Sequence, residues 1–72
     1  MRAIRVVIEQ REDGFVAYPL GLFGTVVGEG LTADEALADV TGAIHFHLET
    51  FGPEGWETES PVLDAEIRTV RI

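Results

Sequence analysis

Apolar and polar residues alternate over the first third of the chain, as they do in β-strands. Three stretches with this pattern are expected to be strands, at residues 3–9 (AIRVVIE), 15–18 (FVAY) and 25–27 (TVV). In the first stretch Val7 adds apolar character to the second face, which is typical of a central strand. The pair Asp13-Gly14 indicates a tight turn, and Pro19 ends the second strand or places it near an edge. Links this short predict an antiparallel meander.

The apolar spacing changes to a helical period in the middle of the chain. Five apolar residues recur three or four positions apart and define one helical face: Leu37, Val40, Ile44, Leu48 and Phe51. Thr32 can cap the first turn while Glu35 reaches back, which forms a capping box. Gly52 and Pro53 end the pattern, because glycine accepts the left-handed cap and proline does not continue a helix. We therefore expect one amphipathic helix over residues 32–51.

The last apolar stretch, Val62–Ile72, is expected to be a fourth strand. One of its faces carries Leu63, Ala65 and Ile67, and the other carries Val70 and Ile72. This change of phase indicates a bulge, or a strand that is partly covered on both faces. We predict a two-layer α+β fold in the order β-β-β-α-β, in which the fourth strand lies parallel beside the first. The helix then makes a right-handed crossover and covers one face of the sheet.

The other face of the predicted sheet has no helix to cover it. The apolar residues that we expect on this face are Val7, Val16, Tyr18, Val70 and Ile72. A monomer rarely leaves so much apolar surface in water, so we predict that a partner protein or a second copy binds there, in a dimer or larger homo-oligomer. Phe46 lies across the helix from Ile44 and is a further candidate anchor, against the alternative of an exposed aromatic side chain without a role.

Composition narrows the possible functions. The chain has 72 residues, no cysteine, thirteen acidic residues and five basic residues, all arginine, so its formal net charge is −8. Without cysteine, disulfides, thiolate metal sites and cysteine nucleophiles are excluded. Direct nucleic-acid binding needs a basic patch and is not expected, whereas the charge suits plain solubility, a basic protein partner, or a thermophilic or salt-adapted host. No apolar run reaches roughly 20 residues and no secretory signal is evident, so we expect a soluble cytoplasmic protein.

The string IHFHLE (residues 44–49) holds both histidines of the chain. Residues two apart on a helix project about 200° from each other, so His45 and His47 do not chelate one ion. His45 and Glu49 have the required spacing of four, but two ligands make no closed metal site. Ser60, the one serine, has no histidine near it in sequence. We therefore expect no catalytic residue, no cofactor and no metal site.

Several strings resemble the HicB family, antitoxins of bacterial and archaeal toxin–antitoxin modules. The matching pieces, in the family's order, are VVIEQREDGFVAY (6–18), Gly24, Gly30, TADEALADV (32–40) and AIHFHLE (43–49). The resemblance covers most of residues 1–52 and implies that residues 1–72 form a single HicB-like domain with a truncated ribonuclease-H-like fold. It also implies a non-enzymatic module that neutralises HicA, a small basic RNA-cleaving toxin, by covering its active surface.

The chain departs from the family pattern in three respects. The string LGLFG (20–24) replaces the family's PDLPG hairpin, and the segment between Gly24 and Gly30 is one residue longer. The sequence also ends near its predicted fourth strand, without the helix-turn-helix or ribbon-helix-helix domain with which family members bind operator DNA. We therefore expect no operator binding.

Two other functions compete with the antitoxin hypothesis. An orphan homo-oligomeric domain without a toxin partner would use the same apolar sheet face. The likeness to ribonuclease H also allows a metal-dependent nuclease, with Glu9, Glu35 and Asp64 converging on two metal ions. Glu35 is already used by the helix cap, and carboxylates outside a motif are weak evidence for catalysis. We therefore expect a protein that is not an enzyme.

Overall fold

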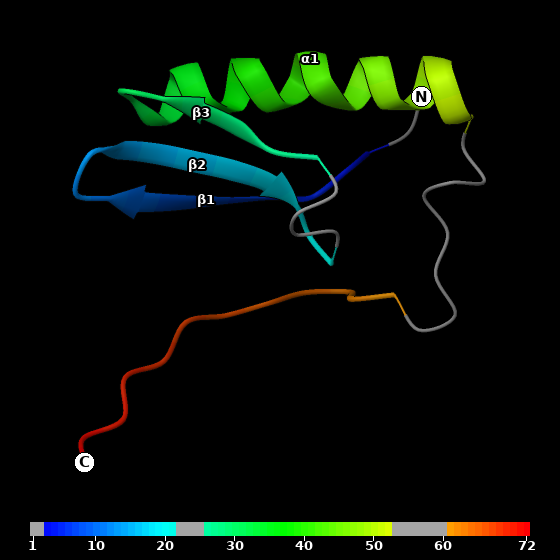
Figure 1. Cartoon of the computed structure of the whole chain (residues 1–72). Coiled ribbons are helices and arrows are strands. Elements are labelled where there is room, and N and C mark those ends of the chain that lie inside the picture. The colour runs from blue at the N-terminus through cyan, green and yellow to red at the C-terminus, as the bar shows by residue number, and fades with distance from the viewer. Residues whose placement is uncertain (1–2, 22–25, 53–60) are drawn as a thin grey trace.

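The computed structural model describes residues 3–21, 26–52 and 61–72. Within these ranges the chain forms three strands and one helix: β1 (Val6–Arg11), β2 (Gly14–Pro19), β3 (Gly28–Gly30) and α1 (Ala33–Phe51). The sheet has the order β1-β2-β3 with both neighbouring pairs antiparallel, and α1 packs on it (Figure 1). The predicted α+β arrangement of a meander followed by one helix is confirmed.

The register of the strands decides which side chains share a face. Ile8 lies opposite Ala17, which in turn lies opposite Gly28, and a Cβ on Gly28 would meet Val40 of the helix. The helix therefore covers the face that carries Ile8, Ala17 and Gly28. Alternate residues point away from it, because successive side chains of a strand project to opposite faces. On the far side Val7 lies opposite Tyr18.

The third strand lies three residues further along the chain than the sequence predicts. We expected it at residues 25–27, but β3 runs from Gly28 to Gly30. Thr25 lies outside the described residues, while Val26 is buried in the core just before the strand. The prediction was wrong because glycine has a low strand propensity, so the sequence GEG carries no strand signal. In the structure Gly28 and Gly30 allow the helix to pack directly against the backbone of β3.

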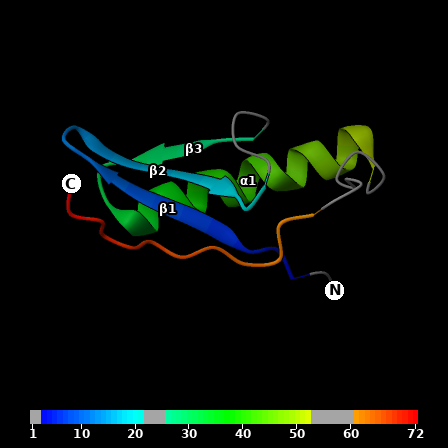
Figure 2. The same cartoon turned by 90° about the horizontal axis from the view of Figure 1, so that it is seen from below.

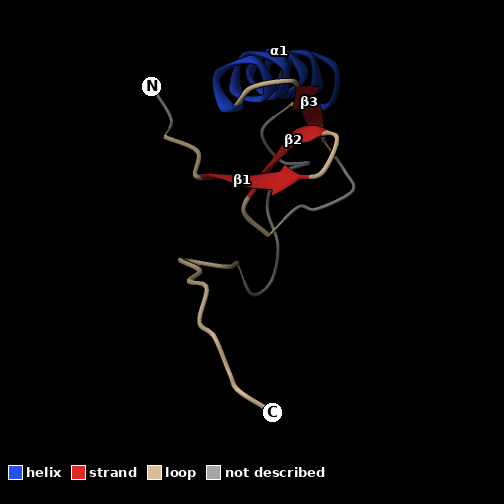
Figure 3. Cartoon of the chain, turned by 90° about the vertical axis from the view of Figure 1, so that its left-hand side faces the viewer, coloured by secondary structure: helices blue, strands red, loops and turns tan. Residues whose placement is uncertain are grey.

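Close approach between α1 and β3 fixes the position of the helix over the sheet. A Cβ placed on Gly28 would lie 2.7 Å from Cα of Val40, and one on Gly30 would lie 2.5 Å from Cβ of Glu35. Real Cβ atoms do not come this close to other heavy atoms, so only glycine fits at these two positions. In Figure 3 the helix accordingly lies beside β3, with β1 the strand more distant from it.

Within the described residues the core is small, which follows from this off-centre position. Its buried residues are Ala17, Val26, Ala36, Val40 and Ile44. The predicted helical face is correct at its centre, but Leu37 is 40% exposed and Phe51 is 64% exposed. The buried stripe runs along residues 36, 40 and 44, which face β3 and β2, so the flank that carries Leu37 has too little sheet beneath it.

Both helix ends have the caps that the sequence predicts. The hydroxyl of Thr32 accepts a hydrogen bond from the backbone N–H of Glu35 at 3.1 Å. The carboxylate of Glu35 reaches back and accepts a bond from the N–H of Leu31 at 2.8 Å, one residue before the cap itself. At the other end Gly52 has a positive φ of 75°, and its N–H donates to the carbonyl of Leu48. The helix predicted over residues 32–51 is therefore confirmed.

Residues 61–72, which we name the tail, form no strand in the structure. The fourth strand predicted beside the first is thus not seen, and β1, predicted to be central, is an edge strand of the described sheet. The tail meets the folded part near its start, where Val62 lies against Gly21 and Asp64 pairs with Arg5 at 3.4 Å. Both partners of this ion pair are mostly exposed, so it holds the tail only weakly. Figure 2 shows the tail passing along the molecule to the C-terminus.

Candidate functional site

The sheet face opposite the helix brings together three of the residues predicted to bind a partner. Val7 and Tyr18 are cross-strand neighbours, and Val16 lies between Glu9 of β1 and Glu29 of β3. We call this surface the open sheet face and define it by Val7, Glu9, Arg11, Val16, Tyr18 and Glu29. Its three apolar or aromatic side chains are half-buried. The structure therefore places an apolar centre between acidic neighbours.

Glu9 is the hub of a polar network on this face. Its Oε2 accepts a hydrogen bond of 2.6 Å from the hydroxyl of Tyr18, and its Oε1 accepts one of 3.0 Å from the guanidinium of Arg11. The bond from Tyr18, with help from the charge and hydrogen bond of Arg11, lowers the pKa of Glu9. The same bond to Glu9 raises the pKa of Tyr18. Near neutral pH the network therefore holds Glu9 ionised and Tyr18 protonated, with fixed orientations.

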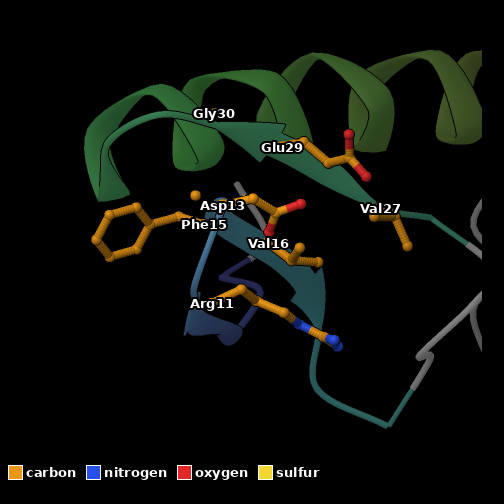
Figure 4. Close-up of a pocket in the computed structure, with 8 residues that line it drawn as sticks. Arg11, Asp13, Phe15, Val16, Val27, Glu29 and Gly30 are labelled. Carbon is orange, nitrogen blue, oxygen red and sulfur yellow. The ribbon is translucent and has the colours of Figure 1, made fainter.

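A hollow opens at the hairpin end of the open sheet face (Figure 4). The residues that line it are Arg11, Asp13, Gly14, Phe15, Val16, Val27, Glu29 and Gly30. Figure 4 shows the ring of Phe15 pointing away from the side on which Arg11, Val16 and Glu29 lie. The carboxylates of Asp13 and Glu29 lie near the side chains of Val16 and Val27. Such a mixture of negative charge and apolar surface suits an arginine or lysine side chain. The aliphatic part of that side chain would pack on the valines, and its charged end would pair with the carboxylates.

Sequence reasoning did not find the two carboxylates of this hollow. The sequence pattern indicates a turn at Asp13 and places Glu29 outside the third strand. Once the register pairs Val16 with Glu29, their common face is fixed. The missing signal was therefore the position of β3, which its glycines conceal.

The other predicted binding residues lie elsewhere. Phe46 is 67% exposed on α1, in the layer that lies on the other side of the sheet. Val70 and Ile72 belong to the tail and are exposed, so the structure does not place them on the open sheet face. The six candidate residues thus form one group of three on the sheet and two separate locations.

The carboxylates considered for a nuclease are used for other contacts. Glu9 bonds Tyr18 and Arg11, Glu35 belongs to the helix cap, and Asp64 lies beside Arg5. Among the described residues, no three histidine, aspartate or glutamate side chains are gathered in a way that could hold a metal ion. Glu9, Glu35 and Asp64 are therefore not brought together, as convergence on two metal ions would require.

The two histidines lie on one continuous helix, where His45 is exposed and His47 is half-buried. The ring of His47 packs against Phe51, with the ring centroids 4.9 Å apart and the planes tilted by 47°. His47 is therefore a residue at the boundary of the core, and its ring contributes to packing at the end of the helix.

No protein family model, curated protein or solved structure matches this chain. The resemblance to HicB antitoxins rests on the residues quoted above and stays a prediction. No helix in the described part of the chain is both long and apolar enough to cross a membrane.

Proposed function

We propose that this chain is a non-enzymatic HicB-like module that works in the cytoplasm and neutralises a small basic RNA-cleaving protein of the HicA-like class. The observation that carries the proposal is the open sheet face, where half-buried Val16 and Tyr18 lie among the carboxylates of Glu9, Asp13 and Glu29. A basic partner would bury the apolar centre and pair its cations with the surrounding acids. The resemblance to HicB supports the same kind of partner.

The charge of the whole chain supports this choice. A formal net charge of −8 attracts a basic protein over distances of about a Debye length and speeds its association. The same charge opposes binding to operator DNA, which the proposal leaves out. On the open sheet face Arg11 is bonded to Glu9, so it compensates one carboxylate and leaves the charges of Asp13 and Glu29 for a partner.

A four-stranded sheet, with the tail parallel beside β1, belongs to the same proposal. The ion pair between Arg5 and Asp64 suggests the register, in which each tail residue lies opposite the residue 59 positions earlier. Arg5 is on the open face, because it alternates with Val6 and shares the parity of Val7. Even-numbered tail residues would then join that face, which places Val70 and Ile72 at the partner-binding surface, as the sequence predicts.

Titration calorimetry with a purified small basic HicA-like RNA-cleaving protein tests the proposal. We expect a stoichiometric complex and inhibition of RNA cleavage. Glu29→Arg reverses one charge on the open sheet face, and we expect it to weaken binding by at least about tenfold. Glu49→Arg makes the same charge change on an exposed helical position and serves as the matched control. The absence of binding by the unmodified chain, or equal effects of the two variants, contradicts the proposal.

Self-association without a toxin is the second candidate function, and the exposed tail favours it. Leu63 is 81% exposed and Ile67 is 98% exposed. A monomer would leave both apolar side chains in water, whereas an oligomer could bury them. Light scattering on the purified chain separates the two functions. A dilute, stable monomer rules out the oligomer, whereas an oligomer that does not inhibit the toxin favours it over the antitoxin function.

A further inference from the structure

The two edges of the sheet are treated differently by the rest of the chain. At the β3 edge the N–H of Glu29 donates to the carboxylate of Asp39 at 2.9 Å, so the helix covers this edge. At the β1 edge no described segment pairs with the strand. Unpaired strand edges bind other strands readily, and proteins usually protect them. One edge of this sheet is therefore closed and the other is ready to accept a strand.

The hydrogen-bond pattern shows which groups of β1 are available. The carbonyl of Arg5 accepts a bond from the N–H of Leu20, so residues 5, 7, 9 and 11 direct their backbone groups toward β2. The backbone N–H and C=O groups of Val6, Ile8 and Gln10 consequently point away from β2, in the plane of the sheet, at its free edge. The side chain of Ile8 is also 40% exposed although it lies on the helix-covered face. A strand added here would bond the backbone and cover this side chain.

The tail has the length, pattern and direction of such a strand. It runs beyond the unpaired side of β1 and in the same direction, but separated from it (Figures 1 and 3). Every one of its twelve residues, 61–72, is exposed. With Asp64 aligned to Arg5, as in their ion pair, Leu63, Ala65 and Ile67 fall beside Ile4, Val6 and Ile8 on the helix-covered face. Arg68 falls beside Glu9 on the open face, so a second pair of opposite charges forms in the same register.

We propose that the tail of one copy pairs in parallel with β1 of a second copy, and that the exchange is reciprocal. Within a single chain the tail extends past its own edge and leaves that edge vacant. A second copy can therefore occupy the edge without breaking a strand pair of either sheet, and the exposed ion pair of Arg5 with Asp64 is exchanged for the same pair between the copies. Strand addition to an exposed edge is a common mode of association, and a twofold pair uses it twice.

The area involved reaches the lower limit for a specific dimer. Eight residue pairs, from Ile4 and Leu63 to Arg11 and Val70, extend over about 26 Å. If each tail covers a strip about 10 Å wide, both partners together lose roughly 520 Å² per tail, and two tails bury about 1,050 Å², close to the roughly 1,000 Å² that a specific interface needs. A chain of this size has a thin margin of stability, and its described part has five buried apolar residues in the core, so the additional burial has a large effect. The dimer does not depend on a toxin partner.

A cysteine pair tests which copy supplies the strand, and the natural chain has no cysteine to interfere. Gln10 and Thr69 lie opposite each other in the inferred register, and both are exposed. The double variant Gln10→Cys with Thr69→Cys is oxidised and examined on a non-reducing gel. We expect a covalent dimer. A monomer bridged within one chain, or no bridging at all, overturns the proposal.

Two controls keep the result interpretable. Gln10→Cys with Glu49→Cys places the second thiol on an exposed part of the helix and should give little bridging, because that residue is far from the edge in the proposed dimer. Sedimentation equilibrium on the unmodified chain should give a dimer mass, and Ile67→Asp should weaken the dimer by at least about a hundredfold. Leu31→Asp, at an exposed apolar residue outside the proposed contact, should leave it unchanged within about threefold. A monomeric natural chain overturns the proposal independently of any cysteine variant.

Discussion

The carboxylate of Asp39 accepts a hydrogen bond from the backbone N–H of Glu29 across 2.9 Å and thereby ties the helix to the outer edge of β3. This bond joins the two layers at the strand on which the helix rests. It also removes a free donor from a sheet edge that another strand could otherwise use. Its position explains why a three-residue strand with two glycines keeps a defined place in the fold.

Replacing Asp39 by alanine should lower the free energy of unfolding by about 1 kcal/mol, because a charge-assisted bond to the backbone is lost at a largely exposed site. Asp39→Asn keeps an acceptor and should lose less than half of that amount. Urea unfolding followed by circular dichroism measures both values. Glu49→Ala removes a carboxylate from the same helix without touching the sheet and should change the stability by less than about 0.5 kcal/mol. Equal effects of the Asp39 and Glu49 alanine variants would contradict the role given to the edge bond.

Glycine substitutions should change stability in opposite directions along the chain. A Cβ added to Gly42, in the helix interior, would meet no atom of another element within 4 Å, so Gly42→Ala should stabilise the fold by about 0.5–1 kcal/mol. Gly28→Ala would force a methyl group to 2.7 Å from Cα of Val40 and should destabilise it by about 1–3 kcal/mol. Thermal unfolding of the two variants beside the natural chain checks the prediction. If both variants shift the midpoint in the same direction, the close contact of helix and strand is wrong.

The sequence was most informative where local chemistry decides the structure. The capping box at Thr32 and Glu35, and the stop at Gly52, define the helix to within one residue. The turn at Asp13-Gly14 likewise defines the first hairpin. In each case the determining contacts lie within a few residues of one another, so a single sequence contains them.

The sequence was less informative where tertiary contacts decide. Gly28 and Gly30 occupy β3 because α1 packs so closely that a Cβ at either position would overlap the helix. This steric requirement becomes apparent only once the helix is placed on the sheet. The same off-centre helix leaves Leu37 exposed against the prediction. The acidic hollow was missed for a related reason, since Glu29 joins the open sheet face only through the register of β3. The tail has a strand pattern, but a pattern alone does not supply the neighbour on which pairing depends.

Removal of the helix cap should have a measurable cost. Thr32→Ala deletes the acceptor for the N–H of Glu35 and should lower the free energy of unfolding by about 1 kcal/mol. Glu35→Ala removes the reciprocal bond from Leu31, and the double variant should lose less than the sum of the two, because the bonds orient each other. Denaturant unfolding of the four chains gives the coupling. Thr32→Ser, which keeps the hydroxyl, is the matched control and should stay close to the natural stability.

The bond between Tyr18 and Glu9 predicts a pH dependence at both ends of the scale. Because the pKa of Glu9 is lowered in the folded chain, its contribution to stability is present above the unfolded pKa and is lost as the pH falls through the folded value. The pKa of Tyr18 is raised, so its contribution is present below the unfolded value of about 10 and is lost as the pH rises through the folded one.

Tyr18 is the one tyrosine of the chain, so its phenolate absorbance reports directly on this group. We expect a titration midpoint above that of free tyrosine, which Glu9→Gln should lower by removing the charged acceptor. Glu12→Gln, an exposed residue of the same hairpin, should leave the midpoint unchanged, and a natural chain that titrates like free tyrosine would show that the bond does not persist in solution.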